Sequence, residues 1–191
     1  MTRIPLAASL LSGLIVATTP AVANQHSGAV ANRDALIQQD FHKRVEAYIT
    51  LRTNAVKGIG PLKPTMNPAE IKAGQGALAE RIAAARSDAQ PGDIFTPEIR
   101  QRFRELLAPH LKGEDGRNAK AIVKDDAPPT VPFKVNAVYP EGKPLPTVPA
   151  RLLVNLPSLP KQVEYRIIDK HLILRDTEAN LIVDYMLNAI R

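Results

Sequence analysis

Hydrophobic and polar residues follow one another in the first half of the chain with the period of amphipathic helices. Apolar side chains recur three and four positions apart from Ile37 to Ile49, so they lie on one face of a helix that starts near Asn32. Gly58 can end this helix in a left-handed cap, and Pro61 prevents its continuation. The pattern therefore predicts a first helix between Asn32 and Gly58.

Capping residues indicate where the next helices begin. Asn67 and Thr96 are each followed by a proline, which suits the first helical position, and by a glutamate in the first turn. Pro109 should end or kink the third helix, and residues 113–127 favour a short fourth one. We therefore expect a bundle of three to four helices over residues 32–127. The second helix should pack closely on the first through a face with small residues: Ile71, Gly74, Leu78, Ile82 and Ala85.

Residues 128–160 contain nine of the seventeen prolines of the chain. One extended run, from Phe133 to Tyr139, alternates as an edge strand does. The rest has too many prolines for a sheet ladder, and it predicts an ordered segment that wraps around the body. Its apolar side chains would dock there: Leu145, Val148, Leu152, Leu153, Leu156 and Leu159. A disordered linker is the alternative, in which these side chains would be exposed.

The last segment, residues 161–191, shows the alternation of β-strands. A two-residue turn at Asp169–Lys170 sets the register of a hairpin, with Ile168 opposite His171 and Glu164 opposite Arg175. One face of this hairpin is apolar and should be buried: Tyr165, Ile167, Leu172 and Leu174. A third apolar run, Leu181 to Leu187, fits either a strand or a short helix. The predicted fold is α+β, with an N-terminal helical bundle, a proline-rich wrapping segment and a small C-terminal antiparallel β unit.

The N-terminus has the features of an export signal. Arg3 is followed by an uncharged apolar run from Leu6 to Ala17, and residues 21–23 read Ala-Val-Ala, a pattern that signal peptidase accepts. The run of about 12 residues is too short to span a bilayer, which takes about 20. We expect a signal peptide over residues 1–23, then a flexible tail over 24–31, and a periplasmic or secreted product without a transmembrane segment. A buried N-terminal helix is the alternative.

Charge and composition exclude several classes of function. The chain carries 25 Lys and Arg against 19 Asp and Glu, and these are spread thinly, which argues against a nucleic-acid partner. It has no cysteine, so disulfide scaffolds, thiolate zinc sites and cysteine nucleophiles are excluded. The four histidines are isolated in the sequence, and no phosphate loop or dinucleotide motif occurs. We therefore expect neither a metal nor a cofactor.

The polar face of the C-terminal hairpin is the candidate binding surface. Arg166 lies beside the pair of Glu164 and Arg175, and a third strand would bring Asp184 to the same place. Arginine recognises carboxylates and phosphates well, so Arg166, Arg175 and Asp184 form a candidate docking surface. The alternative is a solvated face whose charges only keep the protein soluble.

Two classes of function remain open at this stage. The first is a non-enzymatic protein that binds or organises an envelope or extracellular partner, which the sequence does not identify. The second is a cell-wall or ester hydrolase that uses paired carboxylates, for which Asp176 and Asp184 are candidates. A cleft holding two carboxylates would favour the hydrolase, and an apolar groove would favour the binding protein.

Several short motifs occur together in a recognisable order. They are the stretches 92–98, 135–140, 156–160 and 164–166, followed by Asp184. This order resembles that of a group of exported, uncharacterised bacterial proteins to which no activity is assigned. The resemblance implies export and the same succession of elements along the mature chain. It carries over no catalytic residue.

Overall fold

The protein is described here by a computed structural model that places residues 23–57, 65–125, 133–140 and 142–190. The predicted signal peptide lies outside these residues except for Ala23. The fold is α+β, as predicted, because the helices precede a three-stranded antiparallel sheet of order β1-β2-β3. The elements are α1 (Ala23–Lys57), α2 (Pro68–Ala85), α3 (Pro97–Leu107), the 3-10 turn η1 (Ala108–Leu111), α4 (Gly113–Asp125), α5 (Ala150–Leu153), β1 (Val163–Ile168), β2 (His171–Asp176) and β3 (Leu181–Met186).

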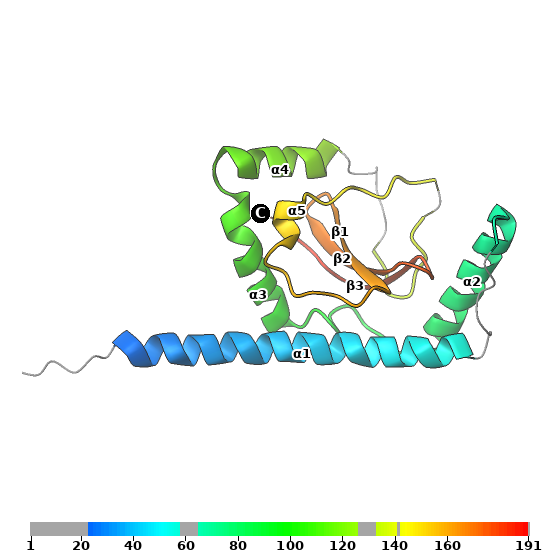
Figure 1. The fold of residues 1–191 in the computed structure, drawn as a ribbon, viewed down its shortest axis with the longest axis horizontal. Coiled ribbons are helices and arrows are strands. Elements are labelled where there is room, and N and C mark those ends of the chain that lie inside the picture. The colour runs from blue at the N-terminus through cyan, green and yellow to red at the C-terminus, as the bar shows by residue number, and fades with distance from the viewer. Residues whose placement is uncertain (1–22, 58–64, 126–132, 141, 191) are drawn as a thin grey trace, which may run out of the picture.

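The long helix α1 runs along one side of the molecule (Figure 1), and α3 and the sheet lie against it. Its buried side chains Phe41, Val45 and Tyr48 are those of the predicted apolar face. The helix begins at Ala23, so the predicted tail of residues 24–31 is helical instead. Once the buried turns of α1 have formed, each further residue adds a hydrogen bond at little cost, and the helix extends backward.

The helices α2 and α3 begin where their capping residues predict. The Asn67 side chain accepts a hydrogen bond from the Ala69 amide at 3.0 Å, and Pro68 is the first residue of α2. The predicted buried face of α2 is wrong at both ends, because Ile71 and Ala85 are exposed. Only the C-terminal part of α2 approaches α1 (Figure 1), and there the helix buries Leu78, Ala79 and Ile82.

The hairpin of β1 and β2 has the predicted register, from Ile168 opposite His171 to Glu164 opposite Arg175. The third apolar run is a strand, β3, which settles the choice between strand and helix. The sheet separates two clusters. The helix side carries the predicted buried face of Tyr165, Ile167, Leu172 and Leu174. The other side buries Tyr139, Ile168, Ile173 and Ile182.

The segment from Phe133 to Tyr139 is not a regular strand, contrary to prediction. It forms a single bridge with β3, between Val138 and Leu181. Asn136 adopts φ +66°, in the left-handed region, which interrupts the extended backbone. Further along the proline-rich stretch, Leu152 and Leu156 are part of the main core, and Leu145 packs against the second cluster.

Candidate functional site

Two members of the predicted docking surface lie together, but they bind the same internal carboxylate. Arg166 Nη2 donates to Glu164 Oε2 at 2.6 Å, and Arg175 Nη1 donates to Glu164 Oε1 at 2.5 Å. Arg175 Nε also donates to Asn180 Oδ1 at 2.9 Å, and Arg166 Nη1 to the Pro146 carbonyl at 3.2 Å. Burial alone would raise the pKa of Glu164, but the hydrogen bonds and charges of the two guanidinium groups outweigh it and lower that pKa. Four of the six guanidinium nitrogens therefore have an internal acceptor, whereas Arg166 Nε is buried without one.

Asp184 does not join this pair, and the expectation that it lies beside Arg166 is wrong. A bulge in β3 is the reason: Leu174 pairs with Asp184 and Arg175 with Ile182, which leaves Val183 as an extra residue. The bulge turns the Asp184 carboxylate to the helix side of the sheet, a displacement that bulges commonly produce.

There Asp184 is fully buried and holds the connection between α2 and α3. Its Oδ1 accepts hydrogen bonds from the amides of Gly92 (2.9 Å) and Tyr185 (2.7 Å). Its Oδ2 accepts from the amides of Ile94 and Phe95, both at 2.8 Å. These four donors account for the lone pairs of the carboxylate, so Asp184 anchors a loop rather than facing a substrate.

The other candidate carboxylate, Asp176, is also fully buried. Its Oδ2 accepts from the Tyr48 hydroxyl at 2.8 Å and from Arg52 Nε at 2.6 Å, which ties β2 to α1. Its Oδ1 accepts from the amides of Glu178 and Ala179 in the turn before β3. Burial, together with the nearby Asp176 charge, raises the pKa of Tyr48 and keeps that phenol a donor. The sequence indicates two carboxylates near turns, but it does not predict that internal donors saturate each of them.

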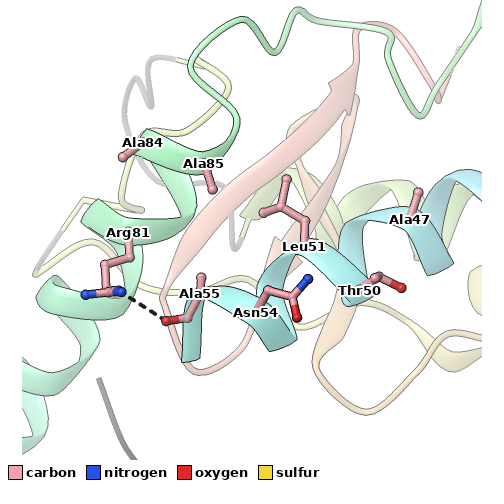
Figure 2. A pocket seen from close by; sticks show the side chains of 8 residues that line it. All are labelled: Ala47, Thr50, Leu51, Asn54, Ala55, Arg81, Ala84 and Ala85. Carbon is pink, nitrogen blue, oxygen red and sulfur yellow. Dashed lines mark hydrogen bonds between the residues drawn. The ribbon is translucent and has the colours of Figure 1, made fainter. Parts of the chain in front are cut away.

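A notch with a volume of about 820 Å³ lies between α1 and α2 (Figure 2). The helices meet near Ala55 and Arg81 and diverge from there, so small side chains from both line the space between them. Most of these side chains are exposed, and no carboxylate is among them. The lining consists of Ala47, Thr50, Leu51, Asn54, Ala55, Arg81, Ala84 and Ala85.

Arg81 supplies the charge of the notch. Its Nε donates to the Ala55 carbonyl at 3.1 Å (Figure 2), which satisfies one of the carbonyls left open at the end of α1. Its two Nη atoms have no hydrogen-bond partner among the residues that the structure describes. The side chain therefore has a structural role and retains donors for a further group.

Comparison of the chain with protein-family models, with curated protein sequences and with solved structures gave no match. In the described part of the chain, no three histidine or carboxylate side chains come close enough to hold a metal ion. Within the same residues, no helix combines the length and the hydropathy that crossing a membrane requires.

Proposed function

We propose that the protein is an exported, non-enzymatic binding protein and that the notch between α1 and α2 receives a helical segment of an envelope protein. The observation that carries this proposal is the notch itself, which is open, about 820 Å³ in volume and lined by small side chains without a carboxylate. The hydrolase alternative would require two carboxylates that face a cleft. It is less well supported, because Asp176 and Asp184 are fully buried and saturated by internal donors.

The dimensions of the notch favour a helix as the occupant. From Ala47 to Ala55 the wall formed by α1 spans nine residues, which corresponds to a rise of about 12 Å or two helical turns. Alanine and threonine side chains allow a third helix to approach to the usual packing distance of about 8–10 Å. A partner helix would thus present one face of about two turns to the notch.

The positive charge in the notch indicates which side chains the partner helix should carry. Arg81 is the charged residue of the lining, and its Nη atoms are available for a carboxylate. We expect the partner to carry small apolar residues on the docking face, with an aspartate or glutamate at the end that meets Arg81. Export rests on the Ala-Val-Ala motif before Asn24 and on the resemblance to exported proteins.

Filling the notch without unfolding the protein tests the proposal. Ala84 and Ala73 are both exposed residues of α2, but only Ala84 lines the notch. Leucine is nearly as good a helix former as alanine, so Ala84→Leu and Ala73→Leu should be equally stable. A photo-crosslinker at Thr50, used in an envelope extract, should trap a partner with the wild type and with Ala73→Leu but not with Ala84→Leu.

Two results would contradict the proposal. The first is crosslinking from Thr50 that Ala84→Leu leaves unchanged, since the notch would then not be the docking site. The second concerns export: N-terminal sequencing of the protein from the periplasm or medium should begin at or near Asn24, and a cytoplasmic product that retains Met1 would refute it.

A further inference from the structure

A second hollow lies on another side of the molecule, where the connection after α2 meets β3. Its volume is about 470 Å³, which falls in the range of about 300–1,000 Å³ typical of small-molecule sites. Three separate parts of the chain form its walls: the end of α2 with the turn that follows, the segment 133–137, and Tyr185 of β3. It shares no lining residue with the notch.

The walls of this hollow are held in place by contacts with the sheet. Asn136 donates its amide to the Ile182 carbonyl at 2.9 Å and its side-chain Nδ2 to the Arg86 carbonyl at 2.9 Å. The Phe133 ring lies 5.6 Å from the Tyr185 ring, measured between centroids, and 5.1 Å from that of His171. A hollow built in this way is formed before a ligand arrives, so binding costs little ordering of the walls.

The lining combines aromatic rings with polar groups that the fold does not fully use. The Lys134 ammonium and the Tyr185 hydroxyl have no hydrogen-bond partner among the residues described, and neither has the buried Oδ1 of Asn136. Ser87 Oγ and Gln90 Nε2 make only long contacts of 3.4 Å, to the side chain and the carbonyl of Asp88. Such a set suits a ligand with several hydroxyl groups and an apolar ring face.

The positive charge in the lining favours an anionic ligand over a neutral one. Lys134 is the charged residue of the lining, and no carboxylate is part of it. Asp93, close to the wall, already accepts the Gln90 amide at 2.8 Å. We infer that this hollow binds a sugar ring that bears a carboxylate, with the ring against Phe133 and Tyr185 and the carboxylate on Lys134. This inference is independent of the notch, because the two surfaces share no residue.

Nuclear magnetic resonance titration of the isotope-labelled protein tests the inference, with glucuronate as the probe. Saturable shifts are expected at the amides of Ser87, Asn136 and Tyr185, with a Kd of about 1 mM. Glucose lacks the carboxylate and acetate lacks the ring, so each should bind about tenfold more weakly or worse.

Two variants separate specific binding from attraction by surface charge. Lys134→Gln should weaken glucuronate binding about tenfold, to the level of glucose, because one charge-assisted hydrogen bond is lost. Lys161→Gln removes an exposed lysine that does not line the hollow and should leave the Kd unchanged. The inference is overturned if glucuronate causes no saturable shift at these amides, if acetate shifts them equally, or if the two variants behave alike.

Discussion

Replacing Asp184 with asparagine tests whether one buried carboxylate holds the α2–α3 connection on the sheet. In the folded protein each oxygen of Asp184 accepts two backbone amides, Gly92 and Tyr185 on one and Ile94 and Phe95 on the other. Asparagine has almost the same shape, but it replaces one of these oxygens by an amino group. That group cannot accept a hydrogen bond, and it would face two N–H donors.

The expected loss follows from the two amides that are left without an acceptor. A buried donor without a partner costs about 1–3 kcal/mol, so Asp184→Asn should lower the free energy of unfolding by about 2–6 kcal/mol. Domains of this size are commonly stable by about 5–15 kcal/mol. The substitution should therefore remove a large part of the stability.

Urea unfolding followed by far-ultraviolet circular dichroism measures this effect. The control is Asp169→Asn, in the exposed hairpin turn, where the backbone has φ +53° and asparagine is as well suited as aspartate. The control should change the free energy of unfolding by less than about 0.5 kcal/mol. If the midpoint of Asp184→Asn moves no further than that of Asp169→Asn, with the same dependence on urea, the anchoring role is refuted.

Three further predictions concern two helix glycines, the ion pairs of Glu164 and the His171 side chain. Gly116→Ala would place a Cβ 2.2 Å from the Leu111 carbonyl carbon and should lower the free energy of unfolding by more than about 2 kcal/mol. Gly76→Ala, in open space, should raise it by about 0.4–1 kcal/mol. Equal denaturant midpoints for the two variants would contradict this. The pKa of Glu164 is lowered in the folded state, so its ion pairs stabilise the protein above the ordinary value of 4.5, and this stability is lost as the pH falls through the folded pKa. Glu164→Gln should therefore make the thermal midpoint less dependent on pH in this range, and an unchanged pH dependence would count against the pairing. Burial lowers the pKa of His171 from 6.5, so stability should fall as the pH drops below 6.5, and His171→Gln should remove that dependence in thermal melts.

The hairpin register could be predicted because everything that sets it is local. A two-residue turn at Asp169 and strict alternation on both sides leave one pairing that buries Tyr165 and Leu174 together, and the structure has that pairing. The caps at Asn67 and Thr96 were predictable for the same reason, since a cap depends on residues within one turn.

The position of Asp184 could not be predicted, because a bulge within β3 and donors from a distant part of the chain determine it. Counting alternate residues along β3 fails at the bulge, where Val183 is the extra residue, and nothing in the run of apolar residues marks it. Three of the four donors that Asp184 meets belong to Gly92 and its neighbours, about 90 positions earlier in the chain. Alternation along the strand therefore predicts a surface position for this carboxylate, although the fold encloses it.

The notch could not be predicted either, because small residues of α2 that the sequence predicts to be buried are exposed there. A helix rich in alanine packs equally well along its whole length or at one end, and sequence alone does not distinguish these cases. In the structure, Tyr48 and Arg52 of α1 are bound to Asp176 of the sheet, and the Arg86 guanidinium, just after α2, donates to the Val183 carbonyl at 3.0 Å. The first two contacts hold α1 on the sheet, and the contact of Arg86 holds the end of α2 there. The two helices therefore meet near Ala55, and the alanines beyond remain open. Under the proposed function, these polar contacts would act on binding indirectly, through the angle between the two helices that line the notch.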